Sequence, residues 1–356
     1  MNASTYTERR EKLRRIMHRE RLSALLITLD ANRYYLSGFE LIDHQVNESA
    51  GCILVTADGN DWLCTDSRYL DAAKRLWNEE RIFIYKTDAA EEINGLVKSR
   101  VSGAIGIEEG AMNVRFWKTF SQGISAQKAD GLVEELRVIK EPEEIKRLRA
   151  SVGLNHKLME WLPGELILES TEEEIAWKVE RFFRSNGAES LAFPSITAIG
   201  KNAALPHAVP GKEKIRENTC VLVDVGCRMN AYCSDQTRTF WVGDKPTDIF
   251  MDTLSHTRTA QERAIAAIRP GMAASAVYAV AREFLDSKGV ATHFTHGLGH
   301  GVGLQTHEGP SLSPRSTATL QPGMVVTVEP GLYYPEWGGV RWEYMVLVTE
   351  GGAEIL

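Results

Sequence analysis

Apolar runs and amphipathic segments alternate along the first third of the chain. Short apolar runs predict buried strands at residues 24–29, 51–55, 62–65, 82–85 and 104–107. Segments with helical periodicity predict helices at residues 6–20, 67–80 and 90–98. Asp58-Gly59-Asn60 separates two of the strands and is typical of a β-hairpin turn. This alternation predicts an α/β layer built around a mixed sheet.

The pattern changes in the segment 132–143, which we interpret as a domain boundary. A helix is expected from Glu143 to about Trp161, and another after the capping residues Ser170-Thr171. Beyond Phe193, short strands and Gly-rich loops dominate, with further helices expected near 251–268 and 273–287. A chain of 356 residues suggests two domains. We expect an α/β N-terminal domain over residues 1–132 and an α+β domain over residues 133–356.

Two carboxylates interrupt apolar strands of the second domain. Asp224 lies within the run 221–225, and Glu329 ends the run 325–329. A carboxylate in a strand that reads as buried on both faces is costly unless a partner compensates its charge. A common partner that compensates both charges is therefore expected near these two positions.

Further polar residues are expected to face the same region. A hairpin of strands 220–226 and 232–241 would place Asp235 near Asp224, with Thr237 on the same face as Asp235. A second pair of strands, 324–334 and 339–349, would bring Glu343 and Arg341 to one face. His300 lies in the Gly-rich stretch 296–304, where the main chain can approach a ligand closely.

Four carboxylates and one histidine thus form a candidate metal site, namely Asp224, Asp235, His300, Glu329 and Glu343. Two carboxylates about 5 Å apart repel each other by roughly 3 kcal/mol even at an effective dielectric constant near 20. Two divalent cations would cancel the four charges and lower the pKa of a bridging water. The oxygen-rich donor set favours Mn²⁺, with Co²⁺, Fe²⁺ or Zn²⁺ as alternatives.

Composition narrows the class of protein. The formal net charge of −7 argues against nucleic acid as the main partner. Five cysteines without CxxC pairs do not form a disulfide pattern and are interpreted as free thiols in a reducing compartment. No apolar stretch approaches about 20 residues, and the N-terminus has no apolar signal-peptide core. We therefore expect a cytoplasmic protein without a membrane partner.

The chain resembles the pita-bread metallopeptidases, in particular the Xaa-Pro branch that contains aminopeptidase P and prolidase. The matching stretches are Leu205-Pro206-His207, VLVDVG (221–226), YCSDQTRTF (232–240), HGLGHGVGLQTHE (296–308), LQPGMVVTVEPGLY (320–333) and GGVRWEYMVLVTE (338–350). In the first domain, TDSRYLDAA (65–73) and LRVIKEPEEI (136–145) resemble the family's creatinase-like N-terminal domain and boundary helix. The resemblance implies a creatinase-like domain followed by a pita-bread catalytic domain, and a homodimer.

The resemblance also implies a role for each matching residue. Asp224 would bind one metal ion, Asp235 and Glu343 would bridge two ions, and His300 and Glu329 would complete the coordination. Glu329 would also act as general base. The remaining roles follow the same motifs: His207 and His307 would contact the substrate in catalysis, and His296, Tyr333 and Arg341 would shape the substrate pocket.

The expected activity is removal of the N-terminal residue from peptides with proline at the second position. The alternatives are an Xaa-Pro dipeptidase, a small-molecule lyase or hydrolase of the same fold, and a binding protein on an inactive peptidase scaffold. Two departures from the family pattern bear on this choice. Tyr344-Met345 follow Glu343 where acidic residues are usual, and Ser311 stands where many prolidases carry an arginine for the terminal carboxylate. Ser311 favours peptides longer than a dipeptide.

Overall fold

The computed structural model describes residues 3–43, 45 and 48–356, and the chain divides between Arg137 and Val138 into two compact units. From the sequence we expect the boundary after residue 132, which is the first residue of helix α6 (Leu132–Arg137). This helix stays with the first unit because it packs against α1 and α2.

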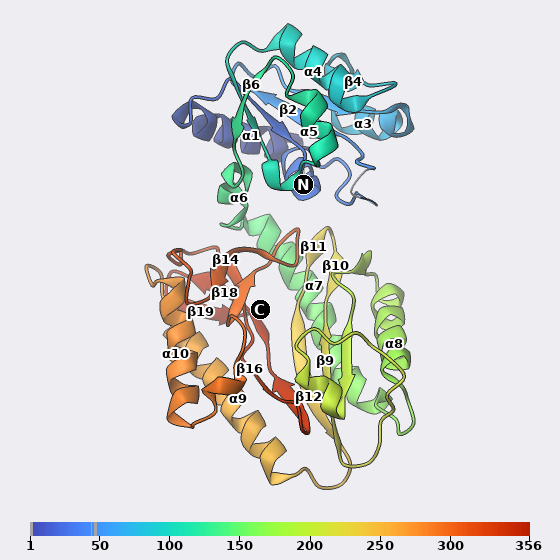
Figure 1. The fold of residues 1–356 in the computed structure, drawn as a ribbon, viewed down its shortest axis with the longest axis vertical. Coiled ribbons are helices and arrows are strands. Elements are labelled where there is room, and N and C mark those ends of the chain that lie inside the picture. Colours follow the sequence, from blue (N-terminus) through green and yellow to red (C-terminus); the bar gives the residue numbers. More distant parts are fainter. Residues whose placement is uncertain (1–2, 44, 46–47) are drawn as a thin grey trace. The chain divides into compact units, whose positions relative to one another are not determined.

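The first unit is built on a mixed sheet with the strand order β4-β3-β2-β1-β5-β6 (Figure 1). Its strands are β1 (Ala24–Ile27), β2 (Cys52–Thr56), β3 (Trp62–Thr65), β4 (Ile82–Ile84), β5 (Ala104–Ile107) and β6 (Ser125–Lys128). Its other helices are α1 (Ala3–Arg19), α2 (Asp30–Ser37), α3 (Leu70–Leu76), α4 (Ala89–Arg100) and α5 (Val114–Phe120). The predicted hairpin is present, with β2 and β3 antiparallel, while β1, β5 and β6 run parallel to one another.

Strand β6 and helices α2 and α5 are among the elements of this unit that the sequence did not predict. Strand β6 has the polar sequence SAQK and is mostly exposed at the sheet edge, so it shows no apolar run. Helices α2 and α5 have eight and seven residues, too few for a clear helical period. Asn113 caps the start of α5, and Gly38 ends α2 with a left-handed φ of 76°.

A buried carboxylate lies beyond the end of β5. Glu108 is 3% exposed and accepts hydrogen bonds from the N–H groups of Thr28 and Leu29 and from the Asn32 amide. The same amide also donates to Glu134 of α6. Burial raises the pKa of Glu108 to about 7, more than these donors lower it.

This pKa predicts that the first unit becomes less stable as the pH rises from about 4.5 to 7. The folded state keeps the Glu108 proton in this window, whereas the unfolded chain, with the ordinary pKa of 4.5, has lost it. The loss should reach about 3 kcal/mol above pH 7. Hydrogen–deuterium exchange of β1 and α2, corrected for intrinsic rates, measures it. The dependence should vanish in Glu108→Gln, and an equal dependence in that variant would contradict the assignment.

The second unit contains two helix pairs and two main sheets (Figure 1). The helices are α7 (Pro142–Trp161), α8 (Glu172–Ser185), α9 (Asp248–Ala267) and α10 (Ala274–Ser287). One sheet has the order β12-β9-β8, formed by β8 (Ile196–Ile199), β9 (Thr219–Val225) and β12 (Gln236–Val242). The other has the order β14-β13-β15-β18-β19, formed by β13 (Gly299–Gly301), β14 (Glu308–Leu312), β15 (Val325–Val328), β18 (Tyr344–Thr349) and β19 (Gly352–Ile355).

Two smaller sheets complete this unit. One has the order β11-β10-β7, formed by β7 (Ser190–Leu191), β10 (Cys227–Met229) and β11 (Tyr232–Cys233). The other pairs β16 (Gly331–Tyr334) with β17 (Gly338–Arg341). The strands of both expected hairpins are interrupted at positions that the sequence did not predict. Residues 227–233 leave the β9–β12 pair to form their own hairpin, and the strand expected over 324–334 breaks at Pro330, which has no N–H for the ladder.

The apolar face of each main sheet is covered by one helix pair. Helices α7 and α8 pack on alternate residues of β9, namely Val221, Val223 and Val225. Helices α9 and α10 lie on the other side of the strands in Figure 1 and pack on β15 and β18. By strand alternation, Asp224 on β9 therefore points away from α7 and α8.

Candidate metal centre

The five expected ligands come from both main sheets. Asp224 lies on β9 directly opposite Thr237 of β12, and Asp235 immediately precedes β12. His300 is the central residue of β13, a short strand within the Gly-rich stretch 296–304. Glu329 follows β15 and Glu343 precedes β18, so both lie where a strand ladder is interrupted.

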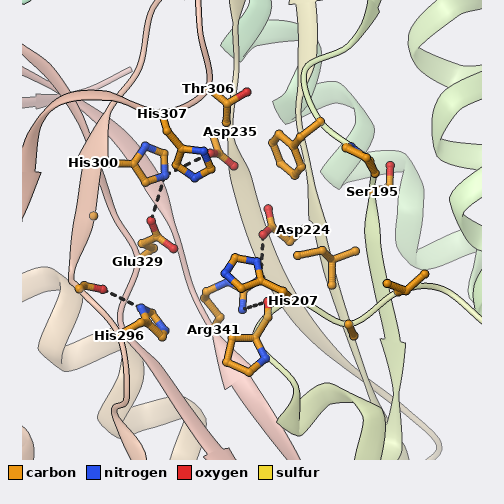
Figure 2. A pocket seen from close by; sticks show the side chains of 18 of the residues that line it. Ser195, His207, Asp224, Asp235, His296, His300, Thr306, His307, Glu329 and Arg341 are labelled. Carbon is orange, nitrogen blue, oxygen red and sulfur yellow. Dashed lines mark hydrogen bonds and ion pairs between the residues drawn. The ribbon is translucent and has the colours of Figure 1, made fainter. Parts of the chain in front are cut away.

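The structure brings these side chains together. Asp224, Asp235 and Glu343 each offer a carboxylate oxygen, and these oxygens all lie within 4.8 Å of one another. His300 Nε2 lies 3.6 Å from Asp235 Oδ2 and 3.3 Å from Glu329 Oε1 (Figure 2). Asp235 therefore belongs to both groups. Asp235 links the three clustered carboxylates to the His300–Glu329 pair.

Burial and mutual repulsion act on two of these carboxylates. Burial raises the pKa of Asp235 and that of Glu343 well above their ordinary values, and the neighbouring carboxylates raise both further. Thr237 lowers the pKa of Glu343 in part, because its hydroxyl donates to Glu343 Oε2 at 2.7 Å. The expected donation from Thr237 into the site is thus present.

His300 and Glu329 each stabilise the charged form of the other. Burial alone would raise the pKa of Glu329, but the hydrogen bond and charge of His300 lower it to about 2. Burial likewise acts to lower the pKa of His300, but Glu329 outweighs it and the pKa is raised. Thr327, which the sequence analysis did not single out, supports both residues: its hydroxyl donates to Glu329 Oε1 at 2.9 Å and accepts the His300 N–H at 3.0 Å. Its position two residues before Glu329 could have indicated this role.

Divalent cations fit this donor set. Within the part of the chain that the structure describes, Asp224 Oδ1 and Glu343 Oε1 are buried and have no hydrogen-bond partner. Buried carboxylate oxygens without partners are costly, and a cation supplies both the missing partner and the missing charge. Carboxylate oxygens with one imidazole suit hard or borderline divalent metals such as Mn²⁺.

We predict that metal uptake releases protons and becomes tighter as the pH rises. The raised pKa values of Asp235, His300 and Glu343 mean that the metal-free protein retains protons at these residues. A metal ion needs the free lone pairs of its ligands, so binding displaces those protons. Calorimetric titration with Mn²⁺ near pH 6, in two buffers with different heats of ionisation, measures the release. A binding heat that is the same in both buffers would contradict the prediction.

A network of hydrogen bonds connects the three residues expected to shape the pocket. Arg341 is 2% exposed, and its Nη2 donates to Asp224 Oδ2 at 2.7 Å. Its Nη1 donates to the Tyr333 hydroxyl at 2.9 Å, and that hydroxyl lies 2.8 Å from His296 Nε2. His296 Nδ1 lies 2.6 Å from the Gly297 carbonyl, which can only accept. Because burial lowers the pKa of His296, its ring is neutral, and the Tyr333 hydroxyl donates to Nε2.

Four of the five expected ligands, namely Asp224, Asp235, His300 and Glu329, line a cavity of about 510 Å³. His207 and His307 line it together with His296 and Arg341 (Figure 2). Ser311 is also a lining residue. The His300 and His307 rings lie 4.2 Å apart. Other lining residues were not predicted because they are apolar and carry no chemical signal in the sequence: Phe193, Pro194, Ile196, Pro206, Ala208, Val209 and Pro210.

Comparison with known families decides the identity of the second unit. Residues 146–350 match the model of metallopeptidase family M24, and residues 9–139 match the creatinase/prolidase N-terminal domain. The chain belongs to metallopeptidase family M24. The expected creatinase-like domain and pita-bread catalytic domain are thereby confirmed.

Individual M24 relatives match almost the whole chain. An Xaa-Pro dipeptidase of Pyrococcus furiosus is 35% identical over 355 residues, covering 98% of this chain and 97% of the relative. The structure of an Xaa-Pro dipeptidase from Bacillus anthracis matches with a TM-score of 0.91 and 32% identity, covering 98% and 97% of the two chains. An X-Pro aminopeptidase from Thermotoga maritima matches with a TM-score of 0.82 and 30% identity, covering 96% and 97%.

Proposed function

We propose that this M24 metallopeptidase is an Xaa-Pro dipeptidase that uses two divalent cations. The observation that carries the peptidase chemistry is the cluster of Asp224, Asp235 and Glu343 at a cavity also lined by His300 and Glu329. The dipeptidase specificity is supported by full-length relatives that bear this name. These relatives favour the dipeptidase over the aminopeptidase that Ser311 led us to expect.

In this proposal, Asp224, Asp235, His300, Glu329 and Glu343 hold the cations. When bound, the cations supply Lewis-acid polarisation of the scissile carbonyl and a nucleophile from water at neutral pH. We propose Mn²⁺ as the metal because carboxylate oxygens dominate the donor set.

The remaining side chains bind substrate and move protons. In this proposal Glu329 is also the general base that accepts the proton of the attacking water, as the family resemblance implies. His307 and His207 line the cavity, and in this proposal they donate hydrogen bonds to the developing oxyanion or the leaving group. The leaving proline nitrogen must gain a proton as its C–N bond breaks, and in this proposal the proton that Glu329 takes from the attacking water is passed to it.

An Xaa-Pro aminopeptidase is the second candidate. Ser311 lines the cavity at the position where an arginine would bind the carboxylate of a dipeptide, and a serine hydroxyl offers no charge for this contact. The match to the X-Pro aminopeptidase from Thermotoga maritima also covers nearly the full chain. Both observations favour peptides that extend beyond the proline.

A time course by mass spectrometry tests the proposal on an equimolar mixture of Ala-Pro, Ala-Pro-Ala and Ala-Ala-Ala with Mn²⁺-loaded protein. Selective loss of Ala-Pro supports the dipeptidase, and selective removal of the first residue of Ala-Pro-Ala supports the aminopeptidase. Survival of all three peptides with metal bound would overturn both and point to a small-molecule substrate.

Oligomeric state and compartment are separate questions. We propose a homodimer on the strength of the family resemblance, and size-exclusion chromatography with light scattering tests it. No helix among the described residues is long and apolar enough to cross a membrane.

A further inference from the structure

The main chain around Glu343 lies outside both neighbouring strand ladders. Strand β17 ends at residue 341 and β18 begins at residue 344, so Trp342 and Glu343 fall in the gap. Side chains and other strands hold this gap instead. Gln261 Nε2 donates to the Trp342 carbonyl at 3.0 Å, and the Glu343 N–H donates to the Thr237 carbonyl at 3.2 Å. A metal ligand at such a gap depends on these contacts for its position.

Arg238 connects β12 to the main chain of this gap. Its side chain lies on β12, the residue is 7% exposed, and Nη1 donates both to the Glu343 carbonyl at 2.5 Å and to the Thr237 carbonyl at 2.8 Å. Thr237 in turn donates its hydroxyl to the Glu343 carboxylate. The guanidinium therefore joins the main chains of β12 and of the gap at the residue whose side chain enters the metal centre.

The charge of Arg238 is compensated in an unusual way. Among the described residues it has no ion-pair partner within 4.0 Å, although it is almost fully buried. Its guanidinium carbon lies 4.3 Å from the ring centroid of Trp342 and 4.1 Å from that of Tyr344. These aromatic residues flank Glu343, and both rings contact the same guanidinium. Cation–π contacts of this kind are stronger when the cation is desolvated, as it is here.

We propose that Arg238, held over the rings of Trp342 and Tyr344, is a positioning residue that fixes the metal ligand Glu343. The inference rests on the proposed function, because it requires Glu343 to bind a metal ion. It gives Tyr344 a physical role: an aromatic ring faces the guanidinium at a position where related sequences usually carry an acidic residue. The ring supplies the attraction that a carboxylate would supply, without adding a further negative charge beside the four carboxylates.

Calorimetric titration of the full-length metal-free protein with Mn²⁺ tests this inference, together with the melting temperature of each metal-free variant. Arg238→Met and Tyr344→Leu should weaken Mn²⁺ binding by roughly 10- to 100-fold, the usual effect of losing a group that orients a metal ligand. Tyr344→Phe keeps the ring and should bind Mn²⁺ like the wild type. Arg258→Met is the matched control, since Arg258 lies 5.1 Å from the Trp342 ring centroid, is 51% exposed, and makes no contact with Glu343. It should leave the affinity unchanged.

The outcomes separate positioning from simple packing. A lower melting temperature with wild-type Mn²⁺ affinity in Arg238→Met would show a structural role only and overturn the inference. If Arg238→Met does not fold, Tyr344→Leu decides: wild-type affinity in that variant overturns the inference. A wild-type protein that binds no Mn²⁺ would overturn the proposed function itself, whereas binding in the wild type with unaffected variants would overturn this inference alone.

Discussion

Replacing Asp235 by Asn should abolish peptidase activity while making the metal-free protein more stable. Asp235 is shared by both groups of ligands, with its Oδ2 lying 3.6 Å from His300 Nε2 and its carboxylate beside Asp224 and Glu343. A neutral amide cannot replace the anionic ligand, so we expect kcat/KM to fall at least about a thousandfold, or about 4 kcal/mol of transition-state stabilisation.

The metal-free variant gains stability because the substitution removes a buried negative charge. Burial and the charges of Glu343, Asp224 and Glu329 raise the pKa of Asp235, so an ionised Asp235 destabilises the metal-free fold. Removing that charge should stabilise the metal-free protein at pH 8 by on the order of 1 kcal/mol, about 2–4 °C in Tm for a domain of this size. Added Mn²⁺ should raise the Tm of the wild type but not of the variant.

The control for this experiment is Asp244→Asn. Asp244 is exposed shortly after β12, so its replacement should leave activity, metal-free Tm and the response to Mn²⁺ unchanged. If Asp235→Asn instead keeps wild-type turnover, or if its metal-free Tm falls, the carboxylate cluster is not a metal site held together by cations.

The sequence indicated the clustered carboxylates of the second unit because burying a charge is costly. An aspartate within Val221–Val225 or a glutamate at the end of Val325–Val328 contradicts the pattern of a buried strand, so the sequence itself marks such positions. Strand alternation was sufficient to predict that Thr237 donates into the site and that Arg341 faces it. The physical basis of these predictions is local and needs no knowledge of the whole fold.

The breaks in the strands could not be predicted in the same way. Residues 324–334 read as one strand, yet β15 and β16 belong to different sheets, and the break follows Glu329. The gap at Trp342 and Glu343 is held by Gln261 and Arg238, which are distant in sequence. Such contacts depend on tertiary packing, so neither the gap nor the stacking of Arg238 on Tyr344 can be derived from local pattern.

The same dependence on packing makes Arg341 the residue whose loss should destabilise the metal-free protein most. Arg341 is 2% exposed and donates to Asp224, Thr237, Tyr333 and the Pro206 carbonyl. Arg341→Met would leave a buried carboxylate unpaired, which costs about 3–5 kcal/mol. Chemical denaturation of the metal-free variant measures this loss.

Mn²⁺ should recover part of that loss, because a cation next to Asp224 supplies the positive charge that the guanidinium no longer provides. Arg149→Met is the matched control. Arg149 and Glu354 form an ion pair of similar length, 2.8 Å against 2.7 Å for Arg341 and Asp224, but both partners are 44% exposed. Its loss should cost less than about 1 kcal/mol and be independent of Mn²⁺. Equal losses in the two variants would mean that burial of the Arg341–Asp224 pair does not govern the stability of this centre.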